Sequence, residues 1–116
     1  MQRTRRTTAA FALALAISSI GVPAASAATL VRGSSMRWHP ATATIARSGV
    51  IKWKAVDTRH TVTSYGTNWS FSRSLAAGSS TTRTFNRRGT YKYYCTIHGS
   101  VSGGVCSGMC GKIVVS

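Results

Sequence analysis

Short β-favouring runs, each bounded by turn residues, recur along the chain from residue 41 to residue 115. β-Branched and aromatic residues dominate these runs, and Gly, Ser, Asn or Asp separate them. No segment carries an apolar period of 3.6 residues over a stretch long enough to predict a helix. Runs spaced by turn signals about every 8 to 12 residues predict an all-β, antiparallel sandwich or barrel. The expected strands are 41–46, 50–56, 60–64, 81–85, 90–94 and 112–115.

The segment from Gly66 to Ser80 is the least strand-like part of this region, because Ser, Gly and Ala dominate it. We expect a long crossing connection here, with a short helical turn at Ser74 to Ala77. Residues 28–116 show no internal repeat, linker or domain boundary, so they are expected to form a single domain. Apolar side chains within the crossing connection are expected to reach the core, namely Trp69, Phe71 and Leu75.

Residues 1–27 have the pattern of a cleavable export signal peptide. A basic head precedes an apolar run over Ala9–Ile20, and Ala25-Ser26-Ala27 forms a small-residue cleavage site. The apolar run is shorter than the roughly 20 residues that span a bilayer, so a retained membrane anchor is the weaker alternative. The pair Arg5-Arg6 leaves both general secretory and twin-arginine export open. We therefore expect an exported protein that is periplasmic, cell-surface or secreted.

The charge balance limits the chemistry that the chain can perform. Three of the 15 Lys and Arg residues lie in the leader, so twelve remain against the single acid Asp57, a formal charge of +11. This balance favours acidic partners or anionic surfaces. With one acid, the chain has neither the paired carboxylates of glycoside hydrolysis nor the oxygen ligands that calcium requires. A Ser-His-Asp site around Asp57 and His60 is not supported by any nucleophile motif.

The stretch from Thr90 to Ser116 places Cys95, His98 and Met109 in order between two strand-like runs. Thiolate, imidazole and thioether form a soft donor set, and a Cys with two His and a distant Met is typical of electron-transfer copper sites. The second His has to come from upstream. His60 opens a predicted strand, whereas His39 precedes a proline and is expected at the surface or the edge of the core.

Three segments of the chain resemble the cupredoxins, the small blue copper proteins of the plastocyanin, amicyanin and pseudoazurin type. Gly49-Val50-Ile51-Lys52-Trp53, followed by Asp57 and His60-Thr61-Val62, resembles the strand that leads to the family's first His ligand. Phe85, Gly89-Thr90-Tyr91 and Tyr93-Tyr94-Cys95 resemble the strand that ends in its Cys ligand. Met109 through Val115 resembles its closing strand. Together these segments cover nearly all of residues 28–116 in the family's order.

The resemblance implies an antiparallel Greek-key β-sandwich that binds one copper ion cycling between Cu(I) and Cu(II). His60, Cys95 and His98 would be the equatorial ligands and Met109 the weak axial ligand, with Met36 expected to fill a gap in the core. The implied function is electron carriage rather than catalysis, and His98 would be the point where electrons enter and leave. The expected partner is a redox protein with an acidic docking surface, bound to a monomer of this chain.

The sequence departs from the family pattern at three places near these ligands. Thr61 stands where the family often has Asn, so the brace between the ligand loops is expected to be looser. Ile97 stands where the family often has Pro, and its N–H is expected to reach the Cys95 sulfur, so an Ile97→Pro change should lower the reduction potential. Ten residues separate His98 from Met109, where the plastocyanin-like pattern has four, and this Gly/Ser-rich insert would hold Met109 poorly by itself.

If Cys95 is the copper thiolate, Cys106 and Cys110 remain to form a disulfide. Four extended residue steps span roughly 13 Å, and a disulfide requires Cα atoms about 4.4 to 6.8 Å apart. The bridge therefore needs a turn through Ser107, Gly108 and Met109, and this turn would clamp Met109 beside the copper. The alternative is a pair of free or separately metal-bound thiols.

Two other functions use the same sequence features. A copper storage or delivery protein would have the same ligands and would differ in reduction potential, exchange rate and partners. A basic exported module for nucleic acid or other anionic polymers would use the positive charge and the aromatic residues. We expect no nucleic-acid binding and at most peripheral contact with a membrane, because most of the aromatics alternate along strands as core residues do: Trp38, Trp53, Trp69 and Tyr91 to Tyr94.

Overall fold

The computed structural model describes residues 27–116. The expected signal peptide and its cleavage site therefore fall almost entirely outside the described residues. Within the described part every regular element is a β-strand, and none of its residues form a helix long and apolar enough to cross a membrane. The nine strands are β1 Thr29–Ser34, β2 Arg37–His39, β3 Thr42–Ile45, β4 Gly49–Ala55, β5 His60–Tyr65, β6 Ser72–Leu75, β7 Ser80–Phe85, β8 Gly89–Ser102 and β9 Val105–Val115.

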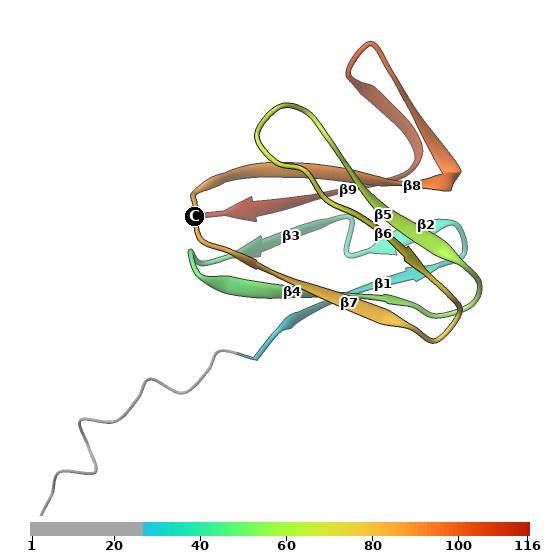
Figure 1. Cartoon of the computed structure of the whole chain (residues 1–116), viewed down its shortest axis with the longest axis horizontal. Helices are drawn as coiled ribbons and strands as arrows, with labels where there is room; N and C mark the ends of the chain where they lie inside the picture. The colour runs from blue at the N-terminus through green and yellow to red at the C-terminus, as the bar shows by residue number, and fades with distance from the viewer. Residues whose placement is uncertain (1–26) are drawn as a thin grey trace, which may run out of the picture.

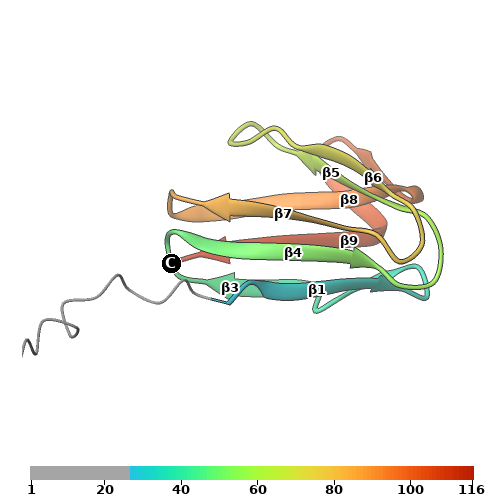
Figure 2. The same ribbon diagram turned by 60° about the horizontal axis from the view of Figure 1, so that its bottom comes forward.

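Two sheets face each other as a sandwich, with strand orders β2-β1-β4-β7 and β3-β9-β8-β5-β6 (Figure 1). The strands run along the long axis of the domain, and the loops gather at its two ends (Figure 2). The predicted all-β sandwich is confirmed, although the sheets are mixed rather than wholly antiparallel. β1 runs parallel to β4, and β3 runs parallel to β9. Local patterns could not show this, because each parallel pair joins strands that are separated in the chain by other elements.

The core lies between the sheets and is built from alternating residues of each strand. In β4 the side chains of Ile51, Trp53 and Ala55 are buried, while Lys52 and Lys54 are exposed. This period of two is the pattern that the β-rich run predicts.

Aromatic contacts join the core across the two sheets. The ring of Trp53 lies 5.4 Å from that of Tyr93, edge to face, and Tyr93 lies 5.5 Å from Trp38. Such pairs contribute about 0.5–1.5 kcal/mol each beyond the area they bury. Burial also raises the pKa of the Tyr93 phenol, so this group stays neutral.

The segment from Gly66 to Ser80 differs from expectation in one respect. Trp69, Phe71 and Leu75 are buried, as predicted. The expected helical turn at Ser74 to Ala77 is wrong, because Ser74 and Leu75 belong to β6, which pairs antiparallel with β5. Hydrogen bonding to β5 thus decides the conformation of a sequence with weak strand propensity of its own.

The hairpin of β1 and β2 was not predicted, and its tip exposes Met36. Ser34 pairs with Arg37, so Ser35 and Met36 form a two-residue turn in which both have positive φ, 53° and 57°. Turns of this kind usually contain Gly or Asn, and neither residue is present to signal one. Met36 is 61% exposed, so the expectation that it fills a gap in the core is wrong.

The segment between His98 and Met109 is a β-hairpin rather than an irregular loop. β8 and β9 continue beyond the sandwich, with pairs from Gly99–Gly108 to Ser102–Val105, and this extension leaves the body of the domain (Figure 1). The turn residues Gly103 and Gly104 have φ of 56° and 76°. Consecutive positive φ values match the twist of the flanking strands in a two-residue hairpin turn, and glycine adopts them without steric cost.

Candidate metal centre

Three side chains converge at the end of the sandwich where β5 begins. His60 is the first residue of β5, and Cys95 and His98 belong to β8. One donor atom from each lies within 4.8 Å of the other two. The Cys95 Sγ is 3.8 Å from His60 Nδ1 and 3.6 Å from His98 Nδ1. The structure thus brings together the three residues expected to be equatorial ligands.

The conformation of β8 explains how two of these residues reach one point. β8 pairs with β9 up to Tyr94, and the register shifts before pairing resumes at Gly99. Residues in such an irregularity escape the strict alternation of side chains along a strand. Cys95 is buried as the next residue in the alternation of Tyr91 and Tyr93, whereas half-buried His98 departs from that alternation and so reaches the same site.

The tautomer of His60 is set by Asp57. The Nε2 of His60 lies 2.8 Å from Asp57 Oδ1. An ionised carboxylate only accepts hydrogen bonds, so Nε2 carries the proton and Nδ1 presents a lone pair toward Cys95. This hydrogen bond is the main cause that lowers the pKa of Asp57 to about 2, and the Ser35 N–H adds to it. A metal-binding His whose other nitrogen donates to a carboxylate is the usual arrangement in metal sites.

Thr61 forms the brace between the two ligand segments. Its Oγ1 accepts the Thr96 N–H at 2.8 Å and lies 3.0 Å from Thr96 Oγ1. Thr63 Oγ1 also donates to it, at 3.2 Å. One hydroxyl thus makes three hydrogen bonds. Two of them tie the start of β5 to Thr96, the residue after Cys95, and the third, from Thr63, lies within β5.

The backbone hydrogen bond to the sulfur also comes from Thr61. Its N–H lies 3.3 Å from Cys95 Sγ. Among residues 27–116, no such bond joins the Ile97 N–H to the sulfur, and the Ile97 side chain is 51% exposed. The expected role of Ile97 is therefore taken by Thr61, which removes the reason for the predicted effect of Ile97→Pro.

Met109 is buried beside His60. A Cβ added to Gly33 would lie 3.0 Å from His60 Cδ2 and 3.1 Å from Met109 Cε, so both side chains reach the same point. Met109 is fully buried. Gly33, on β1, leaves the space in which the imidazole and the thioether meet. No sequence signal pointed to Gly33, because its role depends on contacts between three separate strands.

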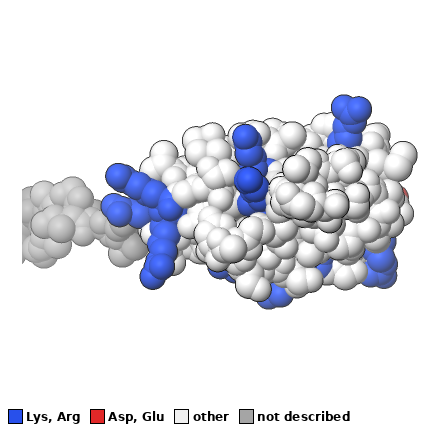
Figure 3. All heavy atoms as spheres, turned by 90° about the horizontal axis from the view of Figure 1, so that it is seen from above, with Lys and Arg blue, Asp and Glu red and all other residues white. Residues whose placement is uncertain are grey.

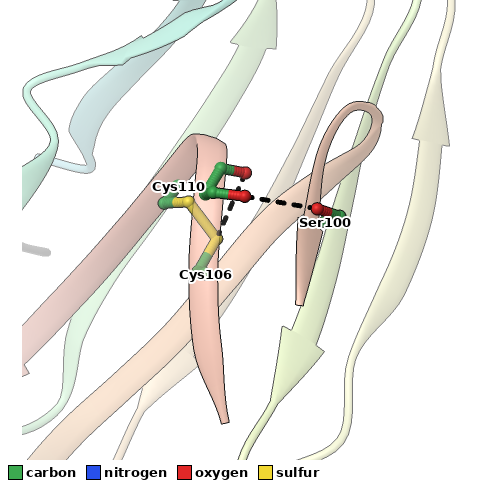
Figure 4. The surroundings of a disulfide bond; sticks show 4 residues. Ser100, Cys106 and Cys110 are labelled. Atoms are coloured by element: carbon green, nitrogen blue, oxygen red, sulfur yellow. Dashed lines mark hydrogen bonds between the residues drawn. A yellow bond between two sulfur atoms is a disulfide. The ribbon is translucent and has the colours of Figure 1, made fainter. Parts of the chain in front are cut away.

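The disulfide between Cys106 and Cys110 is present, with Cα atoms 6.1 Å apart (Figure 4). An extended chain of four steps would span roughly 13 Å, so the strand bends sharply between the two cysteines. Gly108 makes the bend with φ of 85° and packs against the backbone of His98 and Gly99. Met109 therefore lies between the bend and the second cysteine, as the expected clamp requires.

A side-chain hydrogen bond near the disulfide further joins the two arms of the hairpin. Ser100 Oγ lies 3.3 Å from Ser107 Oγ, as the dashed line in Figure 4 shows.

His39, which was expected at the surface or the edge of the core, is exposed, and its Nε2 lies 3.2 Å from the Ser34 carbonyl oxygen. It lies outside the group of three convergent donors.

These residues fit a copper ion by their chemistry. Cys95 is a buried thiol without a disulfide partner, and two imidazole nitrogens face it. A site of one thiolate, two imidazoles and a thioether selects copper over harder ions. The donor set His60, Cys95, His98 and Met109 is consistent with one copper ion.

Solved structures of copper proteins share this fold. A reduced amicyanin mutant is 21% identical, with a TM-score of 0.63, over 83% of this chain and 97% of amicyanin. A purple cupredoxin from Nitrosopumilus maritimus is 20% identical, with a TM-score of 0.59, over 76% of this chain and 99% of that protein. A copper-containing nitrite reductase from Thermus scotoductus SA-01 gives 20% identity and a TM-score of 0.65 over 78% of this chain, but only 22% of the reductase chain is covered.

The sequence comparisons decide the family. No curated protein sequence matches the chain. Residues 25–116, which include every described strand, match the copper binding proteins of the plastocyanin/azurin family. Together with the sandwich fold and the His-Cys-His-Met donor set, this match shows that the chain belongs to the plastocyanin/azurin family of copper-binding proteins, the cupredoxins.

Proposed function

We propose that this chain is an exported mononuclear blue copper protein that shuttles single electrons between redox partners and catalyses no reaction of its own. His60, Cys95, His98 and Met109 are the proposed ligands. The supporting observation is that both imidazole Nδ1 atoms face one buried thiol at 3.6 to 3.8 Å. Copper, when bound, supplies one-electron exchange between Cu(I) and Cu(II).

The surrounding residues serve this role by holding the donors still. Asp57 keeps the His60 proton on Nε2, and Thr61 hydrogen-bonds both to the Cys95 sulfur and to Thr96. Burial of Cys95 and Met109 keeps water away from the sulfur donors. Donors that move little between oxidation states favour rapid electron exchange, because little rearrangement accompanies each transfer.

His98 is the proposed path for the electron. It is the half-buried ligand, and it borders a hollow of about 900 Å³ that Met36, Arg37 and His39 also line. A partner docked in this hollow would contact a ligand of the copper directly. The exposed Arg37 and the overall positive charge favour a partner whose docking surface is acidic.

Electron self-exchange of the copper-loaded protein tests this function. We expect rapid exchange, seen as broadening of NMR resonances when the oxidised and reduced forms are mixed. A His98→Gly variant should lose most of this rate. His39→Gly is the matched control, because His39 lines the same hollow without facing Cys95.

Two results would contradict the proposal. Exchange at the wild-type rate in His98→Gly would show that the electron does not pass through this residue. Slow exchange in the wild-type protein itself would favour copper storage or delivery, which needs the same ligands but no rapid electron transfer.

A further inference from the structure

Three arginines gather at the end of the domain farthest from the metal centre. Arg47 lies in the turn between β3 and β4, and Arg87 and Arg88 lie in the turn between β7 and β8. The two turns are adjacent, because the Ser48 N–H donates to the Phe85 carbonyl oxygen at 2.6 Å. All three arginines are exposed, and we call them the arginine pole. Figure 3 shows Lys and Arg side chains gathered at this end of the domain, where β1 begins.

No side-chain carboxylate neutralises the arginine pole. Asp57 is the single acid of the chain and lies at the other end, where it bonds His60. Among residues 27–116, the side chains of the three arginines make no hydrogen bond or ion pair, whereas Arg59 donates to Ser74 Oγ. A terminal carboxylate at Ser116, whose carbonyl accepts the Arg47 N–H, would offset one of the three charges.

A small hollow adjoins the arginine pole and adds further donors. Its volume is about 290 Å³, and it is bordered by Arg83, Arg87, Asn68 and Asn86 over the rings of Trp69 and Tyr91. Guanidinium and amide groups are the side chains that bind phosphate oxygens through several hydrogen bonds at once. This end of the molecule therefore combines unpaired positive charge with a recess that guanidinium and amide groups line.

We propose that the arginine pole docks the exported protein on the anionic phospholipid surface of a membrane, with the copper end directed away from it. A bilayer is favoured over a soluble polymer because the expected leader of the exported precursor joins the domain at this pole, which would bring the arginine pole to a membrane surface before cleavage. β1 begins at this pole, since Thr29 pairs with Ile51, two residues after Gly49 of the same turn. The apolar run that ends at Ile20 is joined to Ala27 by a segment that reaches at most about 25 Å when extended.

This orientation would leave the metal centre free to meet a redox partner. Six residue steps along β8 separate Gly89, beside the arginine pole, from Cys95. At the usual rise of a strand, the distance between them is about 20 Å. The hollow beside His98 opens at the far end from the lipid surface. Docking by one end and electron exchange at the other therefore do not compete for the same surface.

The expected affinity is that of a reversible peripheral protein. Each Lys or Arg near an anionic bilayer favours binding by about fivefold, so three of them favour it by roughly a hundredfold. Binding of this kind weakens as salt is added.

Cosedimentation with phospholipid vesicles tests the proposal on the mature protein, which contains every strand of the fold. We expect binding to vesicles with a third phosphatidylglycerol at low salt, and none to vesicles of phosphatidylcholine alone. The triple variant Arg47→Gln/Arg87→Gln/Arg88→Gln should bind roughly a hundredfold more weakly. The control triple Arg32→Gln/Lys54→Gln/Lys112→Gln removes the same charge from exposed positions elsewhere and should lose far less binding.

The control decides between a docking surface and net charge alone. Equal losses in the two triple variants would overturn the proposal, because only the total charge would then matter. Binding to soluble polyphosphate without binding to anionic vesicles would also overturn it, in favour of a soluble phosphate polymer. Circular dichroism of both variants checks that they are folded. Because the test can use copper-free protein, its result is independent of the proposed electron-transfer function.

Discussion

Asp57 organises the metal centre although it is not one of the proposed ligands. Its carboxylate accepts hydrogen bonds from His60 Nε2 at 2.8 Å, from the Ser35 N–H at 2.8 Å and from the Thr58 N–H at 3.0 Å. It thereby joins the tip of the β1–β2 hairpin to a ligand. As the single acid of the chain, it also places the one negative side chain beside the site.

Replacing Asp57 with Asn should raise the reduction potential of the bound copper. Asn keeps an oxygen that can accept the His60 proton but removes a negative charge, and negative charge stabilises the more positive oxidised site. For a carboxylate about 7 Å from the metal and an effective dielectric constant near 40, the lost Coulomb energy is about 1 kcal/mol. This corresponds to a rise of roughly 40 mV in the one-electron reduction potential. Protein-film voltammetry measures it. Asp57→Glu, which keeps the charge, is the control, and an unchanged or lower potential in Asp57→Asn would contradict the account.

Thr61→Val should destabilise the copper-free protein by about 1–2 kcal/mol, because it removes three hydrogen bonds in a partly buried place. Thr63→Val is a matched control, since Thr63 shares only one of these bonds, the one to Thr61 Oγ1. Chemical unfolding of both variants gives the comparison. Equal stabilities would show that the Thr61 hydroxyl does not hold the ligand segments together.

The proposed ligands were easier to recognise in the sequence than the residues that support them. Cys95 and His98 stand at a fixed spacing next to a strand, and His60 opens another, so the sequence itself shows them. The roles of Thr61, Gly33 and Asp57 depend on contacts between separate strands. In the sequence, Asp57 was assigned no role beside the metal, although a lone acid three residues before a predicted metal-binding His was a signal of that role.

The hairpin at the ends of β8 and β9 is the element that distinguishes this chain from the plastocyanin-like pattern. It replaces a short ligand loop with paired strands, a Gly103-Gly104 turn and the Cys106–Cys110 disulfide. The chain between His98 and Met109 is therefore held by backbone pairing as well as by the covalent bridge.

Replacing both Cys106 and Cys110 with Ser should destabilise the protein by about 2 kcal/mol, the value expected for so small a closed ring. The same variant should shift the visible spectrum of the copper form, because Met109 loses one of its two constraints. Guanidinium unfolding and absorption spectra measure the two effects. Ser107→Ala, which removes only the bond to Ser100, is the control; a double variant as stable as the control would contradict the account.

The strands whose residues favour β-structure by themselves were predicted. The strands that form only through pairing with a neighbouring strand were not. β4, β5 and β7 have β-branched and aromatic residues in alternation, and their bounds agree with expectation within a residue or two. β6 has the sequence SRSL, which favours no strand by itself. The turn at Ser35 and Met36 lacks glycine, so the β1–β2 hairpin gave no recognisable boundary.

At the scale of the whole molecule, the positive charge has a kinetic consequence. Twelve cationic side chains against one acid should attract anionic reactants and repel cationic ones. The rate at which an anionic metal complex oxidises the copper protein should therefore fall as salt is added, whereas the rate with a cationic complex should rise. Stopped-flow kinetics with the two reagents tests this; the same salt dependence for both would contradict it.

The resemblance to cupredoxins predicted the sandwich and the order of the ligands, but not the parallel pairs of β1 with β4 and of β3 with β9. Strand neighbours are set by the packing of the whole chain, which no local pattern records. The gathering of arginines at one end was equally hidden, because Arg47 is far in sequence from Arg87 and Arg88.

The visible absorption spectrum of the copper-loaded protein tests the proposed copper centre most directly. We predict that one equivalent of Cu(II) gives an intense visible band, because a thiolate bound to Cu(II) transfers charge to the metal on absorption. Cys95→Ser should abolish the band, and Cys106→Ser/Cys110→Ser should keep it. A colourless Cu(II) form of the wild-type protein, or a band that survives in Cys95→Ser, would contradict the proposed centre.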